Sequence, residues 1–278
     1  MLRFFSVFLA TITVAVAAIV ILFPPANSDI KDRALAGAEN QTPGRLKAYD
    51  SLQNFDLRKE SATYTPPVNI AKRHTFTFPE NASTKRTWFG TSPGGFGPFP
   101  TLILLHGSNR PGTSMIDMWR ETAQRQGIVL IAPEAQNPQT WNLSDDGLPF
   151  MQALRNEAEN HYPIDRKQVY VMGHSAGGIF VQSLAGEDNP LWRAMASHGS
   201  ATRANALRRS NTPVPLYLYT GEHDHLFPQE NMQRAARMLS DAGHDVTYVN
   251  IPRHDHWYYK IGPQLAPVIW RDLTGGYE

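Results

Sequence analysis

The sequence predicts an α/β fold in which a mainly parallel sheet carries helices on both of its faces. From about residue 71 onward, short apolar runs alternate with amphipathic segments of helix length, which is the pattern of repeated strand–helix–strand units. The run TLILL at 101–105 is continuously apolar, as is typical of a strand covered on both faces. In such sheets ligands meet the loops that follow the carboxyl ends of the strands. Candidate functional residues are therefore expected at these strand ends.

The individual elements follow from local patterns. HTFTF at 74–78 and KRTWFG at 85–90 alternate apolar and polar residues, which predicts a hairpin of half-exposed strands. Apolar runs predict further strands at 101–105, 128–133, 169–172, 194–199, 214–221 and 246–252. Amphipathic segments predict helices at 113–126, 148–162, from 176 onward, at 229–242 before Gly243, and at 264–273.

Composition and charge narrow the class of protein. With 41% apolar and 18% charged residues, the chain of 278 residues is long enough for one substantial core or two small ones. The 26 Lys and Arg residues nearly balance the 25 Asp and Glu residues, so nucleic acid is not an expected partner. The absence of cysteine excludes disulfides, thiolate metal sites and a cysteine nucleophile. Any metal would have to be held by His and carboxylate side chains alone.

The first 25 residues form a segment of their own. Arg3 is followed by twenty uncharged residues from Phe4 to Phe23, and two prolines close the run. A run of this length can span a membrane as a helix, and it exceeds the apolar core of most signal peptides. We expect an uncleaved transmembrane anchor at residues 4–23, with a signal peptide cleaved near Ala17 as the alternative. Arg3 on the cytoplasmic side would place the rest of the chain outside the cytoplasm, in the periplasm or secreted.

Residues 26–70 are polar and carry only scattered apolar side chains. This composition predicts a linker with one short helix near Leu46 to Leu57. The expected organisation is therefore an N-terminal segment at 1–25, a polar linker at 26–70 and one folded α/β domain at 71–278.

The strongest motif is GHSAGG, which follows the strand expected at 169–172. Gly173, Ser175 and Gly177 form the pattern G-x-S-x-G between a strand and a helix. A nucleophile on so sharp a turn needs glycines two residues away on either side, because side chains there would collide with neighbouring elements. The same letters also occur in ordinary strand-to-helix turns, but the position at a strand end favours a nucleophilic serine.

Two further strand ends carry the tripeptide His-Asp-His, at 223–225 and at 254–256. Asp224 and His256 follow Ser175 in the chain order serine, acid, base that a nucleophile elbow of this type requires. Glu222 is the alternative acid and His254 the alternative base. A metal site built from both tripeptides is a competing interpretation. It leaves GHSAGG unexplained.

Two backbone amides are expected to stabilise negative charge next to Ser175. Ala176 opens the helix after the nucleophile, where the amide points towards a developing charge. The loop HGSNRPG follows the strand at 101–105, and the amide of Ser108 in this loop is the expected second donor.

From about Thr101 to Leu273 the chain resembles the α/β-hydrolase superfamily, and more narrowly the polyhydroxybutyrate depolymerase and feruloyl-esterase-like group. The resemblance rests on the motifs LILLHG, YTGEHDHLFP, IPRHDHWYY, and WNLSDDGLPFMQAL followed by YPIDRKQVYVMGHSAGG. The resemblance implies an α/β-hydrolase fold and a carboxylic ester hydrolase that uses Ser175, Asp224 and His256 as a triad, without a cofactor.

The resemblance also leaves the substrate open. The disulfides and appended domain frequent in polymer-degrading relatives are absent, and the short segment between the strands at 194–199 and 214–221 leaves no room for a large lid. We therefore expect a small or solvent-exposed ester as the substrate. A serine peptidase of the same fold and a non-catalytic binding protein on a hydrolase fold are the alternative functions.

Overall fold

A computed structural model of the protein describes residues 43–51, 55, 64–78, 84–188, 191–202 and 209–275. By its internal contacts the chain divides into the units Met1–Glu39 and Asn40–Glu278, and all described residues belong to the second unit. The prediction of a membrane-spanning protein is contradicted in the described part of the chain, because no helix there is long and apolar enough to cross a bilayer. The segment on which that prediction rested, residues 4–23, lies outside the described ranges.

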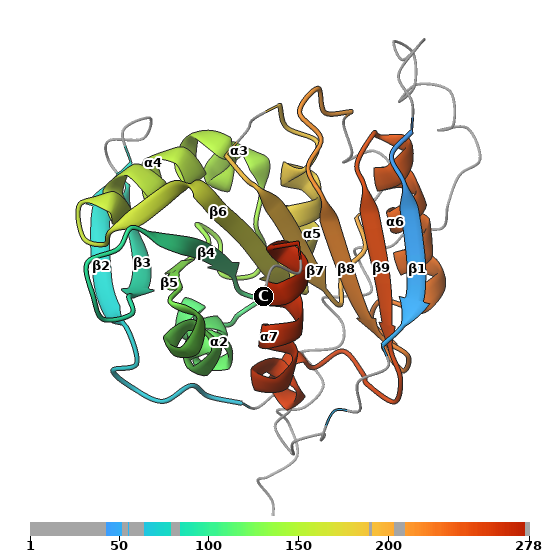
Figure 1. The fold of residues 1–278 in the computed structure, drawn as a ribbon, viewed down its shortest axis with the longest axis horizontal. Helices are drawn as coiled ribbons and strands as arrows, with labels where there is room; N and C mark the ends of the chain where they lie inside the picture. The colour runs from blue at the N-terminus through green and yellow to red at the C-terminus, as the bar shows by residue number, and fades with distance from the viewer. Residues whose placement is uncertain are drawn as a thin grey trace, which may run out of the picture. The chain divides into compact units, whose positions relative to one another are not determined.

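A nine-stranded sheet runs through the domain in the order β1-β9-β8-β7-β6-β4-β5-β3-β2 (Figure 1). Neighbouring strands are parallel from β1 through to β5, and β3 pairs antiparallel with both β5 and β2. This arrangement confirms the predicted α/β class and the hairpin at its edge. The strands are β1 (Leu46–Asp50), β2 (Lys72–Thr77), β3 (Lys85–Thr91), β4 (Phe99–Leu105), β5 (Val129–Pro133), β6 (Ile164–His174), β7 (Ala194–His198), β8 (Leu216–Gly221) and β9 (Val246–Ile251).

Helices cover both faces of the sheet, as the alternating pattern predicts. In Figure 1, α2 and α7 lie in front of the sheet, and α3, α4, α5 and α6 lie behind it. Most bounds lie within a few residues of those expected, while the single-turn α3 and the 3₁₀ turn η4 were not anticipated. The helices are α2 (Gly112–Gln126), α3 (Leu143–Asp146), α4 (Leu148–Glu159), α5 (Ala176–Leu184), α6 (Gln229–Asp241), η4 (Tyr258–Lys260) and α7 (Gly262–Leu273).

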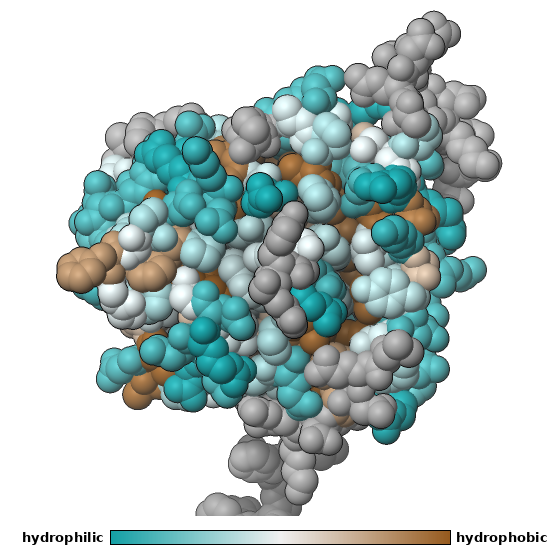
Figure 2. All heavy atoms as spheres, viewed as in Figure 1, coloured by the Kyte–Doolittle hydropathy of each residue, from teal (hydrophilic) through white to brown (hydrophobic). Residues whose placement is uncertain are grey.

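The buried side chains form two clusters, one on each face of the sheet. Trp88 and Phe180 belong to the cluster under α4, α5 and α6. Trp119 and Tyr258 belong to the cluster under α2 and α7. On the face shown in Figure 2, hydrophobic residues lie scattered among polar ones. Burial on both faces explains why the strand sequences are continuously apolar.

The segment expected to be helical near Leu46 to Leu57 contains an edge strand instead. β1 pairs in parallel with β9, so residues 46–50 of the expected linker belong to the sheet. All five residues of β1 are exposed, which explains why no alternating apolar pattern predicted this strand. β1 is attached to the domain by backbone pairing with β9 and by nearby polar contacts, such as the ion pair of Arg45 with Asp245 (2.6 Å).

A buried ion pair ties the edge hairpin to α3. Arg86 on β3 donates to a carboxylate oxygen of Asp146 (2.6 Å) and to the carbonyl oxygens of Glu134 (3.1 Å) and Asp145 (2.9 Å). The same carboxylate accepts the backbone amides of Gln136 and Asn142. Both partners of the ion pair are almost completely buried, so each is the main counter-charge of the other.

Loss of the Asp146 charge should destabilise the fold strongly. Asp146→Asn leaves the Arg86 guanidinium buried without its counter-charge, and breaking a buried pair in this way lowers the free energy of unfolding by about 3–5 kcal/mol. Asp145→Asn is the matched control, because the neighbouring side chain is exposed and its replacement should change stability by about 0.5 kcal/mol or less. Urea denaturation measures both. Equal stability of the two variants would contradict this role for Asp146.

Candidate active site

Ser175 lies at a sharp turn between β6 and α5. Its backbone adopts φ 53° and ψ −118°, a conformation that costs a residue with a side chain about 1–3 kcal/mol. Its amide donates to the carbonyl of His198 on β7 (3.0 Å), and its carbonyl accepts the amide of Ile179 in α5 (2.9 Å). These hydrogen bonds hold the strained turn in which a serine hydroxyl is presented at the edge of the sheet.

The glycines around Ser175 are required by backbone that approaches very closely. A Cβ built on Gly173 would lie 2.2 Å from the carbonyl oxygen of Gly177. A Cβ on Gly177 would lie 2.4 Å from the carbonyl oxygen of Leu105 on β4. Backbone atoms cannot move aside as the end of a flexible side chain can. The G-x-S-x-G pattern is therefore a steric requirement of this turn.

Three side chains from different strand ends form a continuous hydrogen-bonded chain. His256 Nε2 lies 3.1 Å from Ser175 Oγ, and His256 Nδ1 lies 2.9 Å from Asp224 Oδ2. Because a carboxylate only accepts hydrogen bonds, Nδ1 carries the proton and Nε2 offers its lone pair to the serine hydroxyl. The other carboxylate oxygen of Asp224 accepts the amides of Leu226 (3.0 Å) and Phe227 (2.8 Å), which fixes the acid in place.

The alternative residues lie elsewhere. Glu222 is exposed and accepts the amide of Arg253 (2.8 Å). His254 is buried and contacts His198, with 3.0 Å between their Nε2 atoms. His223 and His225 are exposed. Within the described ranges, no group of three or more His, Asp or Glu side chains is arranged to hold a metal ion.

The loop after β4 lies against Ser175. A Cβ built on Gly107 would lie 3.4 Å from the Cβ of Ser175, so the next residue, Ser108, is close to the site. His106 holds this loop, since its Nδ1 donates to the carbonyl of Gly107 (2.8 Å) and its Nε2 accepts the amide of Ala135 (3.1 Å). Ala176 begins α5, where the first amides have no acceptor inside the helix. Both expected amide donors therefore belong to segments next to Ser175.

Aromatic side chains flank His256. The ring of Phe227 stacks on His256 at 5.6 Å between centroids, and Trp257 meets the same ring edge-on at 5.4 Å. Trp141 is buried, stacks on Phe180 and donates its indole N–H to the carbonyl of His106 (2.9 Å). Phe227 and Trp257 thus form the apolar surroundings of the site, and Trp141 supports the loop beside it.

Sequence reasoning missed two residues at the end of β7. Gly199 has φ +54°, and a Cβ there would lie 3.0 Å from His256 Nδ1 and 3.1 Å from Asp224 Oδ2. Only glycine leaves His256 and Asp224 room to meet at this point. His198 precedes it and lies beside His174 in the sheet. The available signal was the repeated ending of neighbouring strands in histidine, as in LLHG, MGHS and ASHG.

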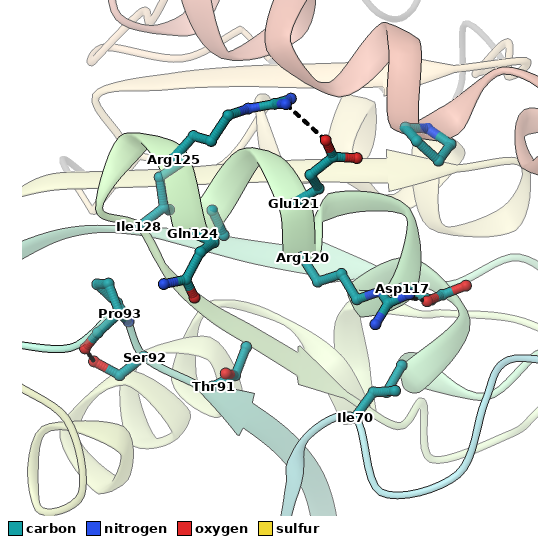
Figure 3. A pocket seen from close by; sticks show the side chains of 12 residues that line it. Ile70, Thr91, Ser92, Pro93, Asp117, Arg120, Glu121, Gln124, Arg125 and Ile128 are labelled. Atoms are coloured by element: carbon teal, nitrogen blue, oxygen red, sulfur yellow. Dashed lines mark hydrogen bonds and ion pairs between the residues drawn. The ribbon is translucent and has the colours of Figure 1, made fainter.

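A cavity of about 610 Å³ lies apart from this site, along α2 (Figure 3). Arg120, Glu121, Gln124 and Arg125 line it from the helix, and Thr91 lines it from β3. Its charged side chains pair with one another: Arg125 with Glu121 (2.7 Å), and Arg120 with Asp117 (2.9 Å). None of its lining residues belongs to the strand ends that carry Ser175, Asp224 and His256.

The model of the dienelactone hydrolase family matches residues 122–262, just over half of the chain. The chain belongs to the dienelactone hydrolase family. The predicted membership of the α/β-hydrolase superfamily is thereby confirmed, and the site formed by Ser175, Asp224 and His256 lies within the matched residues. The family is one of hydrolases, as its name states. The narrower resemblance to depolymerases and feruloyl esterases stays a prediction.

Relatives of this dienelactone hydrolase family member are distant in sequence. It is 22% identical over 151 residues to the bifunctional acetylxylan esterase/xylanase XynS20E of Neocallimastix patriciarum, a match covering 52% of this chain and only 22% of that protein. Among solved structures, the S-formylglutathione hydrolase from Agrobacterium tumefaciens is similar with a TM-score of 0.58 at 13% identity, over 74% of this chain and 95% of that one. A putative dienelactone hydrolase from Klebsiella pneumoniae gives 0.57 at 16% identity, over 75% and 100%. These similarities confirm the α/β-hydrolase fold.

Buried neutral histidines should make stability depend on pH. Burial lowers the pKa of His254 to about 4, and burial also lowers the pKa of His174 and of His198 well below the ordinary 6.5. The unfolded chain takes up protons at these rings below pH 6.5 while the folded chain does not. The free energy of unfolding should therefore fall between about pH 6.5 and pH 4, by roughly 1.4 kcal/mol per pH unit for each such ring.

Urea denaturation at pH 7, 6 and 5 measures this slope, with His254→Gln as the comparison. For the variant, the slope of the free energy of unfolding against pH should be smaller by roughly 1.4 kcal/mol per pH unit, because one of the three rings is missing. Identical slopes for the wild type and the variant would mean that His254 is not a buried neutral histidine.

Proposed function

We propose that this protein is a serine esterase that hydrolyses a carboxylic ester through an acyl-enzyme intermediate. One observation carries the proposal: the unbroken hydrogen-bonded chain from Ser175 through His256 to Asp224, at 3.1 Å and 2.9 Å. The hydroxyl, imidazole and carboxylate stand in the order that nucleophilic catalysis by serine requires. We assign this activity to the folded domain. It comprises the domain expected at 71–278 together with β1, which pairs with β9 at the edge of the sheet.

In the first half of the proposed reaction, Ser175 Oγ attacks the ester carbonyl carbon while its proton passes to His256 Nε2. Asp224 stabilises the imidazolium that results, because its carboxylate already accepts the Nδ1 proton. The ester carbonyl oxygen becomes an oxyanion, for which the amides of Ser108 and Ala176 are the proposed donors. Collapse of this tetrahedral intermediate breaks the bond to the alcohol, and His256 gives its proton to the leaving oxygen.

In the second half, water replaces the alcohol. His256 Nε2 accepts a proton from the water, whose oxygen attacks the acyl carbon bound to Ser175. The same two amides stabilise the second oxyanion. Collapse releases the carboxylic acid and returns the proton to Ser175 Oγ, so the cycle closes with no group beyond those of the chain and water.

For the substrate we propose a short acyl group on an exposed alcohol, such as an acetyl ester. The name of the acetylxylan esterase/xylanase relative supports an acetyl ester on a carbohydrate. Phe227 and Trp257 beside His256 provide an apolar wall against which a small acyl group can pack.

Ser175→Ala should abolish hydrolysis of p-nitrophenyl acetate by the purified protein, with a loss in kcat of about a thousand-fold or more. His225→Asn is the control, since this exposed neighbour of Asp224 should change the rate by about two-fold or less. Release of p-nitrophenol measures both. Activity that survives Ser175→Ala would overturn the proposal, and a wild type that cleaves dipeptide amides but no ester would favour the peptidase.

We further propose that the enzyme works outside the cytoplasm, in the periplasm or secreted. Arg3 followed by the uncharged residues 4–23 is typical of a segment that directs export. Residues 1–40 fused to alkaline phosphatase, which is active only after export, should give an active reporter. A fusion carrying Val14→Arg and Val16→Arg should be inactive, because two charges interrupt the apolar run. Equal activity of the two fusions would contradict export by this segment.

A further inference from the structure

Three buried histidines form a second hydrogen-bonded chain beneath the proposed catalytic residues. His174 Nδ1 lies 3.2 Å from His198 Nδ1, and His198 Nε2 lies 3.0 Å from His254 Nε2. All three side chains are at most 2% exposed. The proposed reaction uses none of them, although burying three imidazoles side by side is costly unless each nitrogen finds a partner.

The three hydrogen-bonded histidines join the backbone segments that carry Ser175 and His256. His174 is the residue before Ser175, and His254 lies two residues before His256. His198 stands between them on β7, and its carbonyl accepts the amide of Ser175 (3.0 Å). These hydrogen bonds link the turn at Ser175 with the loop after β9, as the bond between Ser175 and His256 also does.

The two nitrogen–nitrogen bonds restrict how protons are placed. Each bond needs one N–H and one lone pair, and a neutral imidazole supplies one of each. The N–H groups that form these two bonds therefore point in the same direction along the row of three histidines. His254 Nδ1 is buried and has no partner, and a buried lone pair without a partner is tolerated better than a buried N–H without one. The favoured arrangement has His254 donating to His198, and His198 donating to His174.

We propose that His174, His198 and His254 are positioning residues, which hold the nucleophile turn and the loop of the base in register as a chain of uncharged imidazoles. This inference rests on the proposed esterase activity. The chain acts through Ser175 and His256, and does not touch the substrate. Without it, the two segments keep their strands but lose the fixed distance between Ser175 Oγ and His256 Nε2.

The surroundings favour the uncharged state of the chain. The His174 ring lies 5.0 Å from the His256 ring, which becomes an imidazolium during the proposed reaction. A second positive charge so close would oppose that step. Tyr258 packs against His174 and His198, with centroids 5.7 Å and 5.2 Å away. Arg110 near His174 and Lys260 near His254 also oppose a positive charge, whereas Asp255 and Asp224 favour one on His254. Burial outweighs these two carboxylates and lowers the pKa of His254.

The test compares His254→Gln with His254→Met in the full chain. Glutamine places an amide where His254 Nε2 lies and can bond to His198, whereas methionine has nearly the same shape without that bond. We expect His254→Met to lower kcat for p-nitrophenyl acetate about ten-fold or more with little change in KM, because small displacements of reacting groups cost such factors. His254→Gln should stay within about three-fold of the wild type.

A second pair tests the far end of the chain. Asparagine can replace the Nδ1 bond of His174, and leucine has nearly its shape without the bond. His174→Leu should lower kcat as His254→Met does, and His174→Asn should restore most of it. In the double variant His174→Leu/His254→Met, the losses should not multiply, because one broken link already interrupts the chain.

Nitrogen NMR of the wild-type imidazoles keeps the proposal testable even if a variant fails to fold. At pH 7 the three rings should each show one protonated and one unprotonated nitrogen, and a charged ring among them would overturn the proposal. Equal kcat for the methionine and glutamine variants would overturn it as well, as would losses that multiply in the double variant. A wild type without esterase activity would instead defeat the proposed function.

Discussion

The hydrogen bond between Ser175 Oγ and His256 Nε2 joins residues 81 positions apart, and the rest of the site depends on it. It forms only because β6, β7, β8 and β9 are parallel neighbours whose carboxyl ends meet at one edge of the sheet. The order of the strands therefore decides which side chains meet at this edge. The strained turn at Ser175 and the close approach of Gly199 to His256 are local costs that this parallel arrangement sustains.

Burial around this edge serves two purposes. The apolar clusters on both faces hold the strands rigidly, and the polar groups at the strand ends satisfy one another instead of water. Asp224 illustrates this, because each of its oxygens has a backbone or imidazole donor. His106 does the same for the loop that carries Ser108. Groups held in this way need little reorganisation when charge develops, which is the condition for electrostatic stabilisation of a transition state.

Much of this architecture could be predicted from the sequence because it rests on local patterns. Continuous apolar runs identified the buried strands, and the glycines of GHSAGG identified the turn. The order of Ser175, Asp224 and His256 at strand ends then indicated which residues to bring together. The choice of Asp224 over Glu222 and of His256 over His254 depended on loop geometry, which the structure supplies through the 2.9 Å and 3.1 Å contacts.

Other features left no local signal. β1 is an exposed edge strand held by backbone pairing, so its residues look like those of a linker. The partnership of Arg86 with Asp146 joins residues 60 positions apart, and the chain of His174, His198 and His254 spans three separate segments. Such contacts form only in the tertiary structure, and the hydrophobic periodicity of the sequence does not predict them. The apolar run at 4–23 gave a strong pattern for a segment that lies outside the described residues.

The proposed function depends on activation of the Ser175 hydroxyl by His256 and Asp224. Its most direct test is labelling with a fluorophosphonate, which reacts only with an activated serine, followed by mass analysis of the peptides. The account predicts a single adduct on the peptide that contains Ser175, and almost none in a His256→Gln variant. An unlabelled wild type, or an adduct on a different serine, would contradict it.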